Sequence, residues 1–324
     1  MKKEDAEIRY DIISNEWIII SPKRAIRPNN FQEVRDCPFC DLRDQEKPKF
    51  YLYKGKEGDG KRWTTVVVPN KYPVFNLENE NKKIRDGVYT KIIGKGYHDL
   101  IITKEHDKFL SQLEESRSVE LFTCVQKLIN SYKNKNFVKQ VAIFHNKGDK
   151  SGASQPHPHY QIITLPIIER EFRTELESFK RFYKKNNKCL HCEINERELK
   201  EKERIVLENE HFIAFCPFAP KVGFQVVISP KRHNPNFEKI TEEEKKSLAK
   251  IFKKMLYKYD NVIKEESYNF FIHTAPLDKE YPYFHWYLVF YPRSSSLGGL
   301  EMGFRIEISK AMPEEQAKIL REGK

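Results

Sequence analysis

The segment Gly148–Gln161, GDKSGASQPHPHYQ, places two histidines on either side of one proline. The apolar run at positions 162–165 predicts a strand, on which side chains two residues apart project from the same face. His157 and His159 are therefore expected to point the same way. The Gly- and Ser-containing loop before them offers backbone N–H groups that can surround an anion. This combination favours a site for phosphate groups over two unrelated structural histidines.

The same positions resemble the signature of galactose-1-phosphate uridylyltransferases, the transferase branch of the histidine-triad superfamily. The matching residues are Asn146-Lys147-Gly148, Gly152-Ala153-Ser154, His157-Pro158-His159 and Gln161. The resemblance implies that His159 attacks the α-phosphorus of a nucleotide sugar and carries the nucleotide covalently, while Asn146 and Gly152 contact substrate. Neutral imidazole is a competent nucleophile near neutral pH because its unperturbed pKa is about 6.5. Gln161 would donate a hydrogen bond to the transferring phosphoryl group, and Ser154 with the loop N–H groups would stabilise its charge.

Segments outside the histidine motif also resemble the family. The sequence SPKRAIRP at positions 21–28 is similar to an N-terminal motif whose arginines contact phosphate, here Arg24 and Arg27. Guanidinium groups stay charged and can bind phosphate oxygens bidentately. Asn70, in NKYP after a predicted strand at 64–68, would contact ribose or base. For His98, a supporting role in the site and a purely structural role both stay open.

The C-terminal segment GGLEMG at positions 298–303 resembles the family's hexose-binding loop. In that loop Glu301 would accept hydrogen bonds from sugar hydroxyls. Galactose-specific members place an aromatic residue before this glutamate, and the chain has Leu300 instead. Members that act on ADP-sugars or use phosphate tend to have Gly-Gly-hydrophobic-Glu. The acceptor, and the choice between uracil and adenine, therefore stay open.

The two halves of the chain repeat one order of features: a C-x-x-C pair, an apolar strand ending near a histidine, an amphipathic helix and a second histidine. Those histidines are 51 residues apart in the first half and 52 apart in the second. With the family resemblance, this predicts an α+β fold of two tandem histidine-triad-like lobes, each a mainly antiparallel sheet with a long helix. We expect the lobes to be residues 1–170 and 171–324, with a helical connector after residue 170. The polar stretch Asp41–Arg62 is expected to be a surface loop.

Two C-x-x-C pairs with downstream histidines fit tetrahedral Cys₂His₂ zinc coordination. The predicted ligands are Cys37, Cys40, His106 and His157 in the first lobe and Cys189, Cys192, His233 and His285 in the second. His191 competes as a ligand in the second lobe. The resemblance implies a structural zinc beside the nucleophile in the first lobe. Because Tyr287 stands where the first lobe has His159, we expect one catalytic centre per chain.

Composition constrains partners and location. A net charge of +11 fits an anionic partner, either a phosphorylated small molecule or nucleic acid. A zinc-ribbon nucleic-acid-binding protein is the alternative from another class, but its C-x-x-C pairs would lie about 15–20 residues apart, and Cys40 and Cys189 are much further apart. We therefore expect no nucleic-acid partner. The N-terminus is charged without an apolar core and no apolar run could span a bilayer, so we expect a cytoplasmic protein with no membrane partner.

The resulting interpretation is a hexose-1-phosphate uridylyltransferase that exchanges a nucleoside monophosphate between UDP-glucose and a sugar 1-phosphate through nucleotidyl-His159. The alternative within the same chemistry is an ADP-sugar or nucleotide phosphorylase, an adenylyltransferase that uses phosphate or sulfate as acceptor. Zinc is the expected cofactor. A homodimer is also expected, because the N-terminal arginines of well-studied family members reach across a dimer interface.

Overall fold

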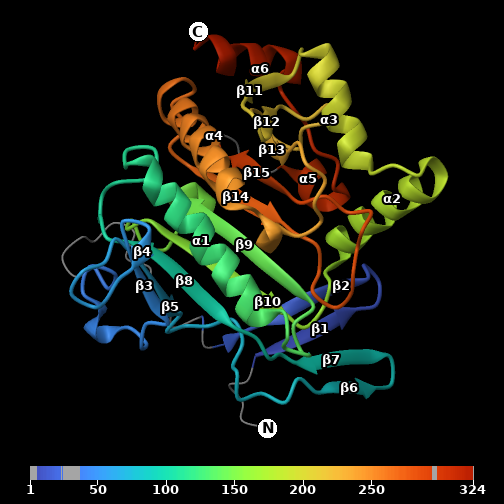
Figure 1. Ribbon diagram of the computed structural model, residues 1–324. Helices are drawn as coiled ribbons and strands as arrows, with labels where there is room; N and C mark the ends of the chain where they lie inside the picture. Colours follow the sequence, from blue (N-terminus) through green and yellow to red (C-terminus); the bar gives the residue numbers. More distant parts are fainter. Residues whose placement is uncertain (1–5, 23, 25–36, 294–297, 324) are drawn as a thin grey trace.

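The computed structural model describes residues 6–22, 24, 37–293 and 298–323 (Figure 1). Its α-helices are α1 (Glu115–Tyr132), α2 (Arg170–Asn186), α3 (Leu190–Glu201), α4 (Glu242–Asn261), α5 (Gly299–Phe304) and α6 (Pro313–Glu322). Up to residue 170 the strands are β1 (Glu7–Asp11), β2 (Glu16–Ile20), β3 (Phe50–Tyr53), β4 (Lys56–Glu57), β5 (Thr65–Pro69), β6 (Lys83–Asp86), β7 (Tyr89–Ile93), β8 (His98–Thr103), β9 (Gln140–Lys147) and β10 (His159–Leu165). After it come β11 (Ile205–Glu208), β12 (Phe212–Phe215), β13 (Val226–Pro230), β14 (Tyr268–His273) and β15 (Tyr287–Pro292).

One large sheet contains eleven strands in the order β11-β12-β13-β15-β14-β9-β10-β8-β5-β3-β4, with antiparallel pairing between neighbours. This confirms the predicted α+β class with mainly antiparallel strands. The two sets of strands that the sequence assigned to separate lobes are joined, because β9 pairs with β14 and places Phe144 opposite Phe271. The junction satisfies the backbone groups that two separate sheet edges would leave unpaired.

Helices α1 and α4 lie side by side across one face of the large sheet (Figure 1). Each buries the apolar stripe that its sequence predicted, including Val125 and Leu128 in α1 and Phe252 and Met255 in α4. Thr241 begins α4 with a capping box that it forms with Glu244. These helices pack against the inward side chains of β9 and β10, so the alternate side chains of those strands face away from them.

A second, smaller sheet has the order β2-β1-β7-β6. Its strand β2 contains the apolar run that directly precedes Ser21. Ile8 and Ile92 from this sheet pack with Phe75 and with Ile163 of β10 in one apolar cluster. The small sheet therefore brings the end of β2 and the segment containing Arg24 close to the large sheet, on the face away from α1.

The prediction of a surface loop at Asp41–Arg62 was wrong for residues 50–57. These residues form the hairpin β3-β4, and β3 extends the large sheet by pairing with β5. Lys54 and Gly55 both have positive φ, 49° and 81°, which suits a two-residue hairpin turn. Leu52 is only 2% exposed, and Phe50 and Tyr51 beside it pack against apolar clusters, so the short run Phe50–Tyr53 anchors the hairpin.

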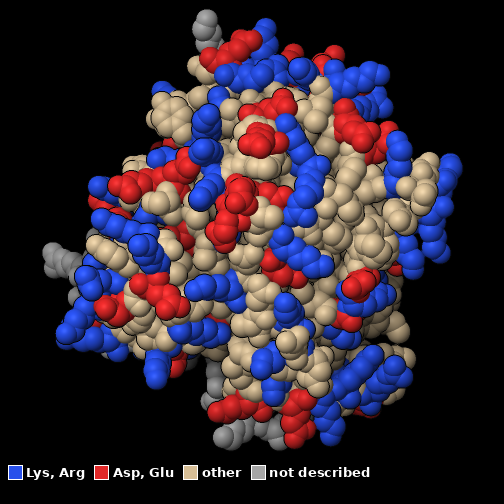
Figure 2. All heavy atoms as spheres, in the orientation of Figure 1, with Lys and Arg blue, Asp and Glu red and all other residues tan. Residues whose placement is uncertain are grey.

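The segment after residue 170 forms helix α2, as predicted for the connector, and buries Phe172, Leu176 and Phe179. On the face shown in Figure 2, Lys and Arg side chains are interspersed with Asp, Glu and uncharged residues. None of the helices in the described part of the chain is long and apolar enough to cross a membrane.

Candidate active site and metal centres

Four predicted ligands of the first lobe meet at one point. The ligand atoms of Cys37, Cys40, His106 and His157 all lie within 4.8 Å of one another. Cys40 Sγ is 3.2 Å from His106 Nδ1, and the His157 Nδ1 atom is 3.4 Å from Cys37 Sγ. A tetrahedral zinc with Zn–S near 2.3 Å and Zn–N near 2.0–2.1 Å separates neighbouring sulfur and nitrogen ligands by about 3.5 Å. The donor set and its spacing therefore fit such an ion.

The second predicted set also converges. The ligand atoms of Cys189, Cys192, His233 and His285 lie within 4.8 Å of one another, and this group does not include His191. Cys192 Sγ is 3.5 Å from His233 Nδ1 and 3.4 Å from His285 Nδ1. The spacing again matches tetrahedral coordination by two sulfurs and two nitrogens.

Backbone carbonyls hold three of the four histidine rings of the two clusters in the orientation that a metal needs. His157 donates Nε2–H to the carbonyl of Thr103 over 2.7 Å, and His285 donates to that of Pro230 over 3.0 Å. His233 donates similarly to Pro282 over 2.9 Å. A carbonyl can only accept, so the proton sits on Nε2 and the lone pair of Nδ1 points into the cluster.

His159 begins β10, two residues after the metal-type ligand His157. Its Nδ1 lies 2.9 Å from the carbonyl oxygen of His157, which assigns the proton to Nδ1 and the lone pair to Nε2. The ring packs against Phe39, with centroids 5.0 Å apart, and the residue is 2% exposed. The structure therefore fixes the His159 ring so that its neutral form carries the lone pair on Nε2, the form that a nucleophilic attack requires.

Gln161 lies on the same strand face as His159 and is held by His98. The backbone N–H of Val74 donates to His98 Nδ1 over 3.2 Å, so His98 carries its proton on Nε2. That Nε2 lies 3.2 Å from Gln161 Oε1 and also 3.1 Å from the amide nitrogen of Asn70. Only the glutamine oxygen can accept the proton, and its engagement directs the Gln161 NH₂ group away from His98.

Gln161 and His98 line a cleft of about 440 Å³. The cleft is also lined by Arg24, Asn146 and Gly152, three residues that the sequence predicted to contact substrate. Among the described residues that line it, none is acidic, so an anion can approach them without meeting a carboxylate. Arg24 is partly buried and donates to the Tyr72 carbonyl over 3.2 Å, which aims its guanidinium along the cleft wall.

Asn70 lines an adjoining cavity of about 450 Å³, whose other lining residues include His98, Tyr97, Lys49 and Asp99. The Tyr72 N–H donates to Asn70 Oδ1 over 2.9 Å, so the amide is held in place by its own turn. Lys49 Nζ lies 2.6 Å from an Asp99 carboxylate oxygen. Burial raises the pKa of Asp99, although Lys49 and Tyr132 oppose that shift.

The remaining predicted residues, Ser154, Glu301 and Arg27, are not among the described residues that line the cleft. Ser154 is described in the loop before β10, and Glu301 is in α5, where its carboxylate accepts the Gly298 N–H over 2.9 Å. Neither residue lines the cleft or the adjoining cavity. Arg27 lies outside the described residues. Glu301 thus has a local structural contact, and its predicted sugar contact stays a prediction.

Sequence reasoning missed two buried residues that support the loop and strand of the site. His145 donates Nδ1–H to the carbonyl of His159 over 2.8 Å, and burial lowers its pKa to about 3. Asn269, from the second half of the chain, donates to Asn146 Oδ1 over 2.7 Å and to the Ser151 carbonyl over 3.0 Å. A polar residue inside the apolar strand 269–272 was the available signal for Asn269. Its hydrogen-bond partners in the first half of the chain could not be predicted from the sequence.

Comparison with known protein families identifies the family of this chain. Residues 1–169 match the N-terminal domain of galactose-1-phosphate uridyl transferase, and residues 175–323 match the C-terminal domain of the same family. The chain belongs to this family. It is therefore a transferase, and the two matches together span nearly the whole sequence.

Two curated relatives cover almost the full chain but have different names. ADP-glucose phosphorylase from Arabidopsis thaliana is 31% identical over 99% of this chain and 94% of the relative. Galactose-1-phosphate uridylyltransferase from Thermotoga maritima is 29% identical over 98% of each. Family membership alone therefore does not distinguish these two activities.

Among solved structures, this chain is similar both to a uridylyltransferase and to an ADP-glucose phosphorylase. A uridylyltransferase structure matches with a TM-score of 0.83, 31% identity and 98% coverage of both chains. The structure of the Arabidopsis thaliana ADP-glucose phosphorylase with bound ADP-glucose matches with a TM-score of 0.80, 31% identity and 98% coverage of both chains.

Proposed function

We propose that this protein is a nucleotidyltransferase that moves a nucleoside monophosphate from a nucleotide sugar to a sugar 1-phosphate, as a UDP-glucose:hexose-1-phosphate uridylyltransferase. The observation that carries the proposal is the fixed tautomer of His159, whose Nδ1–H is donated to the His157 carbonyl over 2.9 Å. The unprotonated Nε2 is the nucleophile. Several full-length relatives named galactose-1-phosphate uridylyltransferase support this reaction.

The reaction proceeds in two exchanges. The Nε2 lone pair of His159 attacks the α-phosphorus of UDP-glucose, a P–N bond forms, and the bond from that phosphorus to the bridging oxygen breaks. Glucose 1-phosphate leaves with the electron pair of that bond. A phosphate oxygen of the incoming sugar 1-phosphate then attacks the same phosphorus and displaces Nε2, which restores the neutral histidine. Each exchange replaces one bond to phosphorus by another, so the covalent route splits one transfer into two easier ones.

The cleft suits the charge that develops during both exchanges. Gln161, with its oxygen engaged by His98 over 3.2 Å, directs N–H groups toward the transferring phosphoryl group. Arg24 adds a permanent positive charge on the cleft wall. Ser154 does not line the cleft, and we assign it, with the backbone donors of the loop before β10, to the same phosphoryl group on the basis of the sequence motif. Asn146 and Gly152 shape the cleft beside this loop. We assign the ribose or base contact to Asn70 in the adjoining cavity.

We propose zinc as the metal of both Cys₂His₂ clusters, because their sulfur–nitrogen separations suit tetrahedral coordination. Bound zinc would supply structural cross-linking here, since each cluster offers four protein ligands and hence a closed coordination shell. His157 would then tie the start of β10 to the C-x-x-C turn and so fix the position of His159. Thiolate ligands persist in a reducing compartment, which supports the proposed cytoplasmic location.

We also propose the lobe boundary near residue 170 and a homodimer. The match to the N-terminal family domain ends at residue 169, and the match to the C-terminal domain begins at residue 175. These limits support that boundary. The dimer is supported by an apolar C-terminal segment, in which Met302, Phe304, Ile306, Ile308 and Met312 are 57–74% exposed. Monomers rarely expose so many large apolar side chains within one short segment. Sedimentation of the wild type and of Phe304→Asp tests this, since the variant should shift toward monomer.

A second candidate function is phosphorolysis of an ADP-sugar, in which phosphate replaces the sugar 1-phosphate as acceptor. The observation that favours it is the 31% identity to ADP-glucose phosphorylase over 99% of the chain, together with Leu300 before Glu301. The nucleophile and first exchange would be the same. The two functions differ in the base and in the group that attacks the nucleotidyl-histidine.

One experiment separates the two functions. The purified protein is incubated with UDP-glucose or ADP-glucose, each with galactose 1-phosphate, glucose 1-phosphate or inorganic phosphate as acceptor, and kcat/KM is measured for each pair. The uridylyltransferase proposal expects the highest value for UDP-glucose with a hexose 1-phosphate. A highest value for ADP-glucose with phosphate would establish the phosphorylase instead.

A further inference from the structure

The second half of the chain contains a cavity of about 710 Å³ that the proposed reaction does not use. It opens to solvent and is lined by α2, α3, the strands β12, β13, β14 and β15, and the loop after β12. Its lining is largely aromatic and aliphatic, with Phe172, Phe179, Phe215, Tyr287 and Tyr291 among the residues. Pockets of roughly 300–1,000 Å³ with apolar walls and a few polar groups are the usual size and character of small-molecule sites.

Strand register places this cavity where the first half has its active-site cleft. In the first half, Gln161 of β10 pairs with Leu100 of β8 and with Phe144 of β9. In the second half, Val289 of β15 pairs with Val227 of β13 and with Phe271 of β14. The metal-type histidines agree with this correspondence, because His157 donates to Thr103 at the end of β8 and His285 donates to Pro230 at the end of β13.

The correspondence aligns the lining residues of the two sites. Cleft residues His98, Asn146, Gln161 and Ile163 correspond to cavity residues Gln225, His273, Val289 and Tyr291, and His159 corresponds to Tyr287. The nucleophile and the phosphoryl-binding glutamine are thus replaced by a phenol and an alkyl group. The cavity keeps the position of a nucleotide site without groups for phosphoryl transfer.

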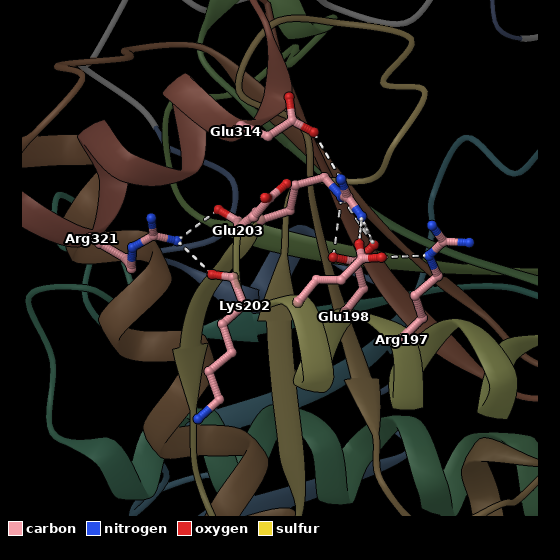
Figure 3. A network of polar contacts seen from close by, with 8 residues as sticks. Arg197, Glu198, Lys202, Glu203, Glu314 and Arg321 are labelled. Atoms are coloured by element: carbon pink, nitrogen blue, oxygen red, sulfur yellow. Dashed lines mark hydrogen bonds and ion pairs between the residues drawn. The ribbon is translucent and has the colours of Figure 1, made fainter.

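The charges around the cavity disfavour a phosphorylated ligand. Five carboxylates line it, from Glu169, Glu171, Glu175, Glu198 and Glu201, against three cations, Arg197, Arg204 and Lys221. Each cation already has a carboxylate neighbour, as Figure 3 shows for Arg197 and for the group around Glu198. A phosphate would have to displace these carboxylates and approach a net negative wall. The cleft of the first half, in contrast, has no acidic residue among the described residues that line it.

The inner wall offers flat rings and one unsatisfied polar atom. His191 stacks on Tyr287 with ring centroids 5.1 Å apart, and Tyr287 stacks on His273 at 4.7 Å. His191 is 7% exposed, and its Nε2 is buried without a hydrogen-bond partner among the described residues. A buried ring nitrogen left unpaired costs free energy, so a ligand that hydrogen-bonds to it gains affinity.

From these observations we infer that the cavity is a second ligand site, specific for an uncharged aromatic heterocycle of nucleobase or nucleoside size. The aromatic wall contacts the heterocycle, and rotation of the His191 ring, whose Nε2 is fully buried in the ligand-free protein, brings that nitrogen to a polar atom of the ligand. The acidic rim excludes the phosphorylated forms that bind in the cleft of the first half. This inference concerns binding alone, and its contrast with the first-half cleft rests on the proposed function.

The test uses the full-length zinc-loaded protein and four probes: adenosine, uridine, AMP and UMP. Calorimetric titrations are carried out on His159→Ala saturated with UDP-glucose or ADP-glucose, so that the first-half cleft is filled without turnover. We expect at least one nucleoside to bind with about one equivalent per chain. Its monophosphate should bind at least tenfold more weakly. A crystal soaked with the nucleoside should show it against Tyr287 and His191.

Two variants in the same background locate the binding. Ile194→Trp fills the cavity from α3, and His191→Phe keeps the ring but removes the unpaired nitrogen. Each should weaken nucleoside binding at least tenfold, whereas Val88→Trp, on an exposed turn remote from the cavity lining, should not. Zinc content and thermal unfolding check that both variants are folded. Absence of nucleoside binding, equal affinity for the monophosphates, or affinity unchanged in both cavity variants would overturn the inference.

Discussion

His98 Nε2 lies 3.2 Å from Gln161 Oε1, and the Val74 N–H engages the opposite ring nitrogen of His98. This pair of contacts fixes three things at once: the tautomer of His98, the rotation of the Gln161 amide, and the side of the cleft that receives its N–H groups. His98 therefore acts through Gln161 and is a positioning residue in this account.

The contact predicts different outcomes for two amide substitutions of His98. In His98→Gln the side-chain NH₂ can occupy the position of Nε2 and still donate to Gln161, so kcat should fall only a few-fold. In His98→Asn the amide reaches only the Nδ1 position, so kcat should fall roughly 10- to 100-fold with little change in KM, because the lost interaction matters most in the transition state. Steady-state kinetics of both variants measure the changes in kcat and in KM separately.

His211→Phe is the matched control, because His211 lies on a loop and its side chain is 31% exposed. It should leave both kinetic constants unchanged. Equal kcat losses in His98→Gln and His98→Asn would show that His98 has only a packing role.

The two metal clusters should lose their ions independently. Cys37→Ser should remove about one zinc per chain and lower the thermal midpoint, because a closed Cys₂His₂ site contributes directly to folding stability. Cys189→Ser should do the same for the second cluster, and elemental analysis gives the counts. Cys37→Ser should also lower kcat more than Cys189→Ser does, since His157 precedes the nucleophile by two residues. Full zinc content in Cys37→Ser would exclude the first cluster as a site.

The buried His145 should make stability depend on pH. Burial lowers its pKa to about 3 in the folded protein, from about 6.5 when unfolded. Its neutral form therefore contributes fully above pH 6.5, and that contribution is lost as pH falls from about 6.5 toward 3. We expect His145→Phe to be less stable than wild type at pH 7 but to lose less free energy of unfolding between pH 7 and pH 4. Urea unfolding at both pH values measures this, and parallel losses in the two proteins would refute it.

Glu301 should control the sugar acceptor if the hexose contact is correct. Leucine at position 300 lacks the flat face with which an aromatic residue packs on a hexose, so we expect weaker discrimination between galactose 1-phosphate and glucose 1-phosphate than an aromatic at that position would give. Glu301→Ala should lower kcat/KM for both sugars roughly 10-fold or more. Leu300→Tyr should increase the difference in kcat/KM between galactose 1-phosphate and glucose 1-phosphate. If Glu301→Ala changes neither value and phosphate is the preferred acceptor, the acceptor is not a sugar.

Much of the molecule followed from local pattern. The helices α1 and α4 have apolar stripes at helical spacing, so their residue types were sufficient to predict them. The C-x-x-C pairs and their histidines were likewise sufficient to predict two sets of metal ligands. The hairpin at 50–57 was missed because the run that anchors it, Phe50–Tyr53, is only four residues long and is flanked by polar residues on both sides. The pairing of Phe144 with Phe271 across β9 and β14 was not predictable either, because it joins segments more than a hundred residues apart. For the same reason, the roles of His98, His145 and Asn269 became visible only from their partners.

The account rests on a covalent nucleotide at His159, and direct labelling tests it. Protein incubated with nucleotide sugar labelled in the α-phosphate, without acceptor, is quenched in alkali and digested, and the labelled peptide is identified by mass spectrometry. We predict acid-labile, alkali-stable label on the peptide that contains His159, and loss of both label and exchange in His159→Ala, with partial turnover of an activated nucleotide restored in His159→Gly by added imidazole. Exchange at more than a few per cent of the wild-type rate in His159→Ala, or label on another residue, would contradict the mechanism.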